Sequence, residues 1–330
     1  MLFRSGNTTG VDNTAVGFSA LGALNGGSSN VAIGLNAGVT LTTGSGNVAI
    51  GAPALRFCIT GSYNTAVGFD CLRNSTASNL TAVGYQALYN NTTGARNNVV
   101  GYQAGYTNSI GSDNSFLGDR AGYNTTGDRN TAIGATAGYW YTSGTDNVSL
   151  GWDAGANGSA CTGSYNVAIG NRALRFNTGT SNNIAIGYQA AYSCQSGGTI
   201  AIGYQAAANL VGSGTSGLTV IGTQAGLLHN TVGDAYGTTF IGYRSGYTNV
   251  SGIDNTLIGA SSGYNTTGSK NTAVGAGVMT TNTAGSENTA MGVRALGINT
   301  AGNANVAIGF YSLANSTASN LTAEIGRAHG

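Results

Sequence analysis

The chain has 330 residues, about twice the length of an ordinary domain, so length alone suggests two globular domains. The composition argues against them, because 56 residues are glycine, one is proline and only 7% are charged, against roughly 25% charged in an average soluble domain. Hydrophobic residues make up 41%, which is enough to form a core and excludes a disordered polar chain. The formal net charge of +1 comes from scattered residues, so we expect no nucleic-acid partner and no anionic membrane surface.

One five-residue motif recurs along nearly the whole chain. Asn-Thr-Ala-Val-Gly at 13–17 returns as Asn-Val-Ala-Ile-Gly at 30–34 and again at 47–51. Eighteen closing glycines run from Gly17 to Gly309 with a mean spacing of 17.2 residues, and no step is shorter than 16 or longer than 20. A fixed period of this length is typical of stacked repeat architectures.

The columns of this repeat predict the role of each position. The residue before the glycine is aliphatic in all 18 copies, the residue before that is Ala in 12, and Asn stands four before the glycine in 14. A short strand with two faces and glycine turns, repeated every ~17 residues, predicts one coil of a β-solenoid. We therefore expect an all-β fold: a parallel β-solenoid of about 18 coils over residues 1–323.

Within each coil we expect the aliphatic and Thr/Val residues to point inward and Ala to point outward, because alternate residues of a strand occupy opposite faces. Glycine permits backbone conformations that other residues avoid, and stacked Asn side chains can form a hydrogen-bonded ladder. The structural residues expected at the corners and in the core, taken from the first three copies, are Asn13, Val16, Gly17, Asn30, Ile33, Gly34, Asn47, Ile50 and Gly51.

The C-terminal segment departs from the repeat. Residues 74–82 recur identically at 315–323, but the second copy then continues as Glu-Ile-Gly-Arg-Ala-His at 324–329. This hexapeptide resembles the translation of a sequencing-library adapter, so we expect residues 324–330 to be a non-native tail and the array to be truncated at both ends.

Residues with chemical potential are sparse, and we expect no catalytic site, no cofactor and no metal site. His229, near Asp234, is expected to be a loop residue rather than a general base. The corner column places acids and bases at equivalent positions, which favours a solvated corner over a calcium ladder; its members are Asp12, Arg96, Asp113, Arg129, Asp146, Asp254, Lys270 and Glu287. The cysteines form no Cys-x-x-Cys pair, so we expect buried thiols at Cys58, Cys71, Cys161 and Cys194 rather than a metal site shared with His229 or His329.

Two surface columns are candidates for binding. The Ala column, interrupted by Val99, Phe116, Val220, Phe240 and Leu257, would form a long apolar stripe if it faced outward, so we expect it to be buried in a parallel homotrimer with the Asn corners facing solvent. An aromatic column offers two interpretations, stacking on sugars of a host-surface polysaccharide or packing along its own length. Its candidate residues are Tyr102, Tyr106, Tyr123, Trp140 and Trp152.

The phrases Val83-Gly84-Tyr85-Gln86-Ala87 and Ile186-Gly187-Tyr188-Gln189-Ala190 resemble repeats of phage tail-fibre-like proteins. The Val-Ala-Ile-Gly core is also similar to the head repeats of trimeric autotransporter adhesins. These resemblances imply an elongated, trimeric, extracellular fibre of a virion or a bacterial cell surface, with a structural and adhesive role and a host-surface receptor. No apolar run reaches the ~20 residues of a membrane span, so we expect no membrane insertion.

The residues match two other functional classes less well. An ice-binding β-solenoid is the alternative, although it requires an outward Thr ladder and Thr falls on the expected core face. A glycan-degrading enzyme needs a cleft with paired carboxylates, and the 11 acidic residues of this chain are too sparse to favour it.

Overall fold

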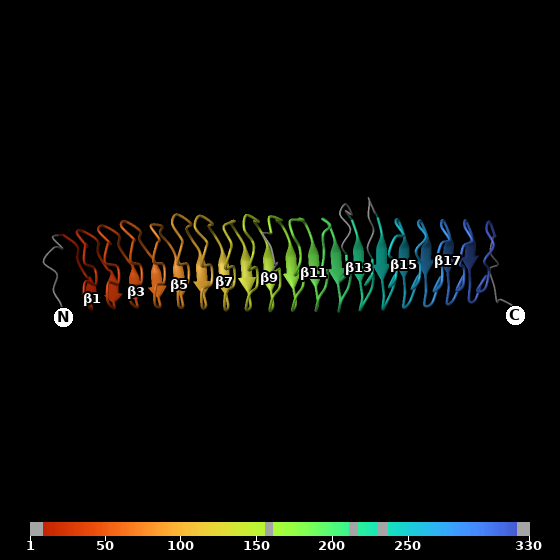
Figure 1. Cartoon of the computed structure of the whole chain (residues 1–330), viewed down its shortest axis with the longest axis horizontal. Helices are drawn as coiled ribbons and strands as arrows, with labels where there is room; N and C mark the ends of the chain where they lie inside the picture. Colours follow the sequence, from red (N-terminus) through yellow and green to blue (C-terminus); the bar gives the residue numbers. More distant parts are fainter. Residues whose placement is uncertain (1–8, 156–160, 211–216, 230–236, 322–330) are drawn as a thin grey trace. The chain divides into compact units, whose positions relative to one another are not determined.

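The computed structural model describes residues 9–155, 161–210, 217–229 and 237–321. The chain divides into two compact units, Met1–Tyr165 and Asn166–Gly330. Within these described ranges the backbone forms short strands, turns and bends and no helix (Figure 1). The described part of the chain accordingly offers no helix that is long and apolar enough to cross a membrane.

The described residues of the first unit carry nine strands of three residues each. Each strand pairs with the next in parallel and without a shift in register, so that Ala15 lies opposite Ala32 and Ala32 opposite Ala49. The strands are β1 (Thr14–Val16), β2 (Val31–Ile33), β3 (Val48–Ile50), β4 (Thr65–Val67), β5 (Thr81–Val83), β6 (Asn98–Val100), β7 (Ser115–Leu117), β8 (Thr131–Ile133) and β9 (Val148–Leu150).

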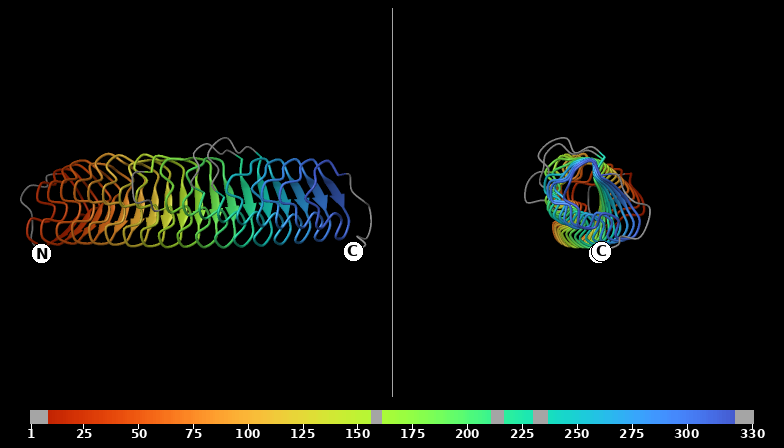
Figure 2. Two further views of the ribbon diagram at one scale, coloured as in Figure 1. Left: turned by 45° about the vertical axis from the view of Figure 1, so that its right-hand side comes forward. Right: turned by 90° about the vertical axis from the view of Figure 1, so that its right-hand side faces the viewer.

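The described residues of the second unit repeat this arrangement with nine further strands, again parallel and in register between successive coils. They are β10 (Val167–Ile169), β11 (Ile184–Ile186), β12 (Ile200–Ile202), β13 (Thr219–Ile221), β14 (Thr239–Ile241), β15 (Thr256–Ile258), β16 (Thr272–Val274), β17 (Thr289–Met291) and β18 (Val306–Ile308). Strands that recur at a spacing of about 17 residues and pair with the coil before and the coil after define a parallel β-solenoid, which confirms the predicted fold class. The looped cross-section of a coil is visible along the stack (Figure 2).

The strand faces are reversed relative to the sequence-based expectation. The central alanines point into the coil, and Ala32 and Ala49 are only 0% and 2% exposed. The prediction that Val16, Ile33 and Ile50 form the core is wrong, because these side chains are 53%, 39% and 37% exposed. The residues that interrupt the Ala column are likewise buried, so this column cannot supply the expected trimer interface.

Complementary side-chain sizes explain why Ala lies inside. In many coils with a central Ala, a bulky core residue comes from the turn after the strand, as with Leu21, Leu55 and Leu88, which are buried six residues after that Ala. In the coils whose central strand residue is larger than Ala or Ser, the residue six positions later is glycine. These pairs are Val99 with Gly105, Phe116 with Gly122, Val220 with Gly226, Phe240 with Gly246 and Leu257 with Gly263.

The glycine partner of each large residue is required by space. A Cβ added to Gly122 would lie 2.6 Å from the ring of Phe116, and one added to Gly263 would lie 2.4 Å from Leu257. Protein interiors are packed as densely as organic crystals, and no described coil has a bulky side chain at both of these positions. This is the size rule for the core.

The glycine that closes each strand has a different reason to be glycine. Gly34 has a φ of +136°, and a Cβ added there would lie 2.7 Å from the carbonyl oxygen of Gly51 in the next coil. The turn glycines such as Gly44 show only the second effect, since a Cβ on Gly44 would meet the carbonyl oxygen of Gly61 at 2.1 Å. Close approach of stacked backbones therefore selects glycine in both columns, and a positive φ adds to it in the first.

The Asn column forms the predicted hydrogen-bonded ladder, but inside the coil. The backbone and side-chain amides of Asn30 donate to Oδ1 of Asn13, and those of Asn47 donate to Oδ1 of Asn30. Each side-chain amide also donates to a turn carbonyl, Gly44 for Asn30 and Gly61 for Asn47. Asn30 and Asn47 are buried, so the expectation that the Asn corners face solvent is wrong; the ladder satisfies backbone groups that water cannot reach.

The expected adapter-derived tail at 324–330 lies outside the described residues, as do parts of the longer repeats at 156–160, 211–216 and 230–236.

Candidate functional site

One candidate interaction surface on each unit is the outer face of its strands. The first and third residues of every strand point outward, and none of them is charged. The third position is always aliphatic and the first is Thr in nine of the eighteen strands. Val100, Leu117 and Met291 are 40%, 50% and 48% exposed. Each unit thus presents an in-register parallel sheet whose outer face carries methyl groups and hydroxyls at the ~4.8 Å spacing of paired strands.

Aromatic side chains stack along the outside of the turns. In the first unit Tyr89, Tyr106, Tyr123 and Tyr139 form a continuous ladder with ring centroids 4.9–5.1 Å apart and nearly parallel planes. A second ladder joins Phe69, Tyr85 and Tyr102, and the described part of the second unit contains the stacked pairs Tyr188–Tyr204 and Tyr247–Tyr264. These separations are favourable for aromatic pairs.

The ladders decide what the candidate aromatics can do. Tyr106 and Tyr123 have a ring on each face, and Tyr102 lies between Tyr85 and the guanidinium of Arg120 at 5.7 Å. Since a sugar stacks on the face of a ring, these three rings offer only their edges. Trp140 is tilted by 59° against Tyr139, and Trp152 is 44% exposed.

The corner column of mixed charges forms ion pairs between successive coils. Arg96 donates to Asp113 through Nε and Nη2 at 2.6 and 2.8 Å, and Arg129 contacts Asp146 in the same way at 2.6 and 2.9 Å. Hydrogen bonds from these guanidinium groups lower the pKa of both carboxyls. The alternating acidic and basic residues, which argue against a calcium ladder, therefore pair neighbouring coils. Because these ion pairs are exposed to solvent, they contribute little to stability.

The reactive side chains are enclosed within the coils. Cys58, Cys71, Cys161 and Cys194 are free and buried, as predicted, and burial raises the pKa of Cys58 to about 11 and that of Cys71 to about 12. Such thiols are unreactive because the thiolate is the nucleophile. Among the described residues, no group of three or more His, Cys, Asp or Glu is placed to hold a metal ion.

His229 lies outside regular secondary structure, as expected of a loop residue, but its side chain is buried in the core. Its Nδ1 lies 2.8 Å from the carbonyl oxygen of Asn249, its ring packs edge-on against Phe240, and its Nε2 is buried without a hydrogen-bond partner. Burial lowers its pKa. Asp234, its expected neighbour, lies outside the described residues.

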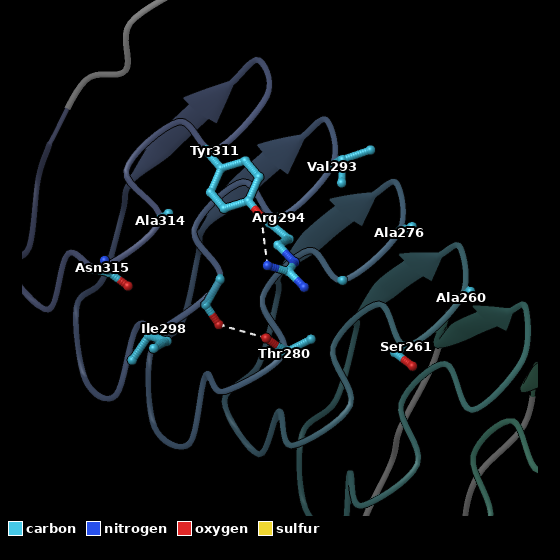
Figure 3. Close-up of a pocket in the computed structure, with 12 residues that line it drawn as sticks. Ala260, Ser261, Ala276, Thr280, Val293, Arg294, Ile298, Tyr311, Ala314 and Asn315 are labelled. Carbon is cyan, nitrogen blue, oxygen red and sulfur yellow. Dashed lines mark hydrogen bonds between the residues drawn. The ribbon is translucent and has the colours of Figure 1, made fainter. Parts of the chain in front are cut away.

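A groove interrupts the outer surface of the second unit (Figure 3). The position after the closing glycine is aromatic in many coils but is Ala260, Ala276 and Val293 in three successive ones. These small residues, with Gly297 and Ala314 on the adjoining turns, leave a volume of about 540 Å³. Sequence reasoning missed this site; the signal for it was the run of small residues within an aromatic column.

The groove has one charged side chain among the residues that line it, Arg294. Its Nη1 donates to the hydroxyl of Tyr311 at 2.6 Å, and its guanidinium carbon lies 5.4 Å from the centre of the Tyr311 ring. The hydroxyl of Thr280 donates a hydrogen bond to the carbonyl oxygen of Gly297 at 2.9 Å, as drawn in Figure 3. The guanidinium of Arg294 and the hydroxyl of Tyr311 thus lie beside the small apolar residues that line the groove.

Comparison with known proteins leaves the solenoid fold as the basis for interpretation. The chain matches no protein-family model, and it matches no curated protein.

Proposed function

We propose that this chain is a non-enzymatic structural and adhesive segment of an extracellular fibre, the shaft of a phage tail fibre or the head of a bacterial surface adhesin. The observation that carries the proposal is the outer strand face: it is uncharged, it has an aliphatic residue at the third position of every strand, and it recurs in the described strands of both units. Apolar patches of more than a few hundred Å² are rare on monomeric soluble proteins and mark interaction surfaces. The modular coils supply length, because each one bonds to the coil before and the coil after.

The proposed assembly is a parallel homotrimer in which this outer strand face, and not the Ala column, is buried. Aliphatic side chains such as Ile33 and Ile50 stand two-fifths exposed in register, so the matching faces of sister chains can interdigitate. Burial of apolar surface contributes roughly 25 cal/mol per Å², and repetition in many coils multiplies a small gain per coil.

Light scattering tests the assembly. We expect a particle of three times the chain mass of 32.8 kDa. Ile33→Lys with Ile50→Lys should give a folded monomer, because both side chains point outward. Ala49→Lys, the matched control between them in sequence, should unfold its coil instead, because Ala49 is buried. A monomeric unmodified protein at micromolar concentration would refute the trimer.

Ice binding is the second candidate, and the structure supplies an observation in its favour. Thr at the first position of a strand faces outward, contrary to the sequence-based assumption, and nine strands carry it there. A flat, regular array of methyls and hydroxyls is the surface that ice binding requires. Thermal hysteresis of the purified protein distinguishes the two functions, since the trimer would cover the same face; a hysteresis that Thr256→Lys and Thr272→Lys abolish would favour ice binding.

A further inference from the structure

We propose that the groove around Arg294 binds an acidic saccharide, with the guanidinium of Arg294 holding the sugar carboxylate. This inference deepens the proposed adhesive function and rests on it, since it names the ligand class and the site through which the fibre would adhere. The site differs from the tyrosine ladders, whose ring faces are covered by neighbouring rings.

The first argument is the electrostatic state of Arg294. It is exposed and makes no ion pair with any described residue, whereas Arg73, Arg96 and Arg129 each contact an aspartate. Its hydrogen bond to Tyr311 and its position over that ring hold the guanidinium in one orientation. A guanidinium held in this way retains N–H donors in a planar fork that matches the two oxygens of a carboxylate.

The second argument is the donor left on Tyr311. Its hydroxyl oxygen accepts the hydrogen bond from Nη1 of Arg294, so the hydroxyl proton remains for a ligand acceptor. The guanidinium and the hydroxyl therefore form a pair of adjacent donors. A single cation favours a singly charged carboxylate over a phosphate, which would leave charge uncompensated at a groove with no second basic residue in its lining.

The third argument is the size and lining of the groove. Its volume of about 540 Å³ falls in the range of roughly 300–1,000 Å³ typical of small-ligand sites. Val293 and Ile298 supply methyl groups, and Ser261 and Thr280 supply hydroxyls (Figure 3). A pyranose ring presents an apolar C–H face and a rim of hydroxyls. An acidic sugar can therefore pack its C–H face on the methyl groups, form hydrogen bonds with the hydroxyls and pair its carboxylate with Arg294.

The repeat itself supplies a variant that fills the groove without disturbing the fold. Ala276 is exposed and occupies the column in which Tyr204 and Tyr243 stand in other coils of the same unit. Ala276→Tyr should therefore fold as those coils do while its ring occupies the groove. The matched control for charge is Arg175→Gln, because Arg175 also donates to a tyrosine hydroxyl, that of Tyr192 at 3.0 Å, but lies outside the groove.

The experiment is calorimetric titration of the full chain with trigalacturonate and with sialyllactose, with neutral galactotriose and inorganic phosphate as comparisons. We expect at least one acidic saccharide to bind, with an affinity that falls as salt rises. Arg294→Gln should weaken that binding at least tenfold, Ala276→Tyr should abolish it, and Arg175→Gln should leave it unchanged.

Three results would overturn the proposal: binding of neither acidic saccharide, equal binding by Arg294→Gln, or tighter binding of phosphate than of either sugar acid. Light scattering on the same samples keeps the proposed function separate. If the protein is a trimer but binds no acidic saccharide, the proposed saccharide site is refuted and the proposed fibre stands. If the protein is a monomer that binds through Arg294, the proposed fibre is refuted and the saccharide site stands.

Discussion

Exchanging the large and small partners inside one coil tests the size rule that governs the core. Phe116 is 1% exposed, and its ring lies against Gly122, where an added Cβ would approach to 2.6 Å, and against Gly105 of the preceding coil, where one would approach to 3.2 Å. Phe116→Ala should cost about 3–5 kcal/mol, because it leaves a cavity that stacked coils cannot close.

Gly122→Leu alone should also destabilise the protein, for two reasons. Its side chain overlaps the ring of Phe116, which costs about 1–3 kcal/mol in a well-packed core, and leucine at the φ of +59° costs about 1–2 kcal/mol more. The double variant restores the pattern of the coil that contains Ala82 and Leu88, where leucine is accommodated at a φ of +51°. It should therefore retain only the backbone cost.

A double-mutant cycle measured by urea unfolding and circular dichroism checks this. We expect the double variant to be at least about 2 kcal/mol more stable than the sum of the single effects predicts. Phe116→Ala combined with Gly101→Ala is the control, because a Cβ on Gly101 meets the backbone oxygen of Gly118, and those two effects should simply add. Additivity in the Phe116/Gly122 cycle as well would refute the size rule.

Four further outcomes follow from the structure. Gly51→Ala should cost at least about 2 kcal/mol, because its φ is +127° and its Cβ would meet a backbone oxygen; Gly237→Ala, whose Cβ meets no atom within 4 Å, should cost less in the same urea titration. Asn114→Ala should lower the free energy of unfolding by about 1–3 kcal/mol, because it leaves a buried backbone N–H of the next coil unpaired; unfolding indistinguishable from the parent would contradict the ladder's role. The thiol of Cys71, whose pKa is raised to about 12, should resist a thiol reagent at pH 8 in the native state and react in urea. Burial lowers the pKa of His229, so the unfolded chain binds a proton more tightly and stability falls as the pH drops from about 6.5, the usual histidine value, towards the folded pKa; His229→Leu should remove that part of the acid sensitivity in thermal melts.

Much of the fold can be predicted from the sequence, because stacking in register turns each structural requirement into a column of one residue type. The strand-closing glycines and the existence of an Asn ladder follow from their columns, although the ladder lies inside the coil and not at a solvent-facing corner. The burial of the cysteines follows from the absence of a Cys-x-x-Cys pair. Stacked coils bring equivalent positions into contact, so Asn30 bonds to the equivalent residue Asn13 of the preceding coil. The recurrence of Asn every ~17 residues therefore indicates this contact in the sequence.

The groove could be predicted less well. Arg294 and Tyr311 lie 17 residues apart in equivalent positions, so the period brings them together, but a column containing both alanine and tyrosine does not show where a volume opens. That depends on side chains from three coils at once.

The direction of the strand faces was decided only by the tertiary structure. A period of two residues shows that Val48 and Ile50 share a face and that Ala49 occupies the other, and it carries no information about which face is inside. Hydrophobicity suggested the aliphatic face, yet the interior of a ~17-residue coil is narrow and already holds the leucines of the turn, such as Leu55. Alanine at the strand centre leaves room for such a leucine, and where the strand centre is larger the leucine is replaced by glycine. The burial of His229 was likewise decided by the tertiary structure: it occupies the column of Leu24 and Leu41, and this column lies in the core.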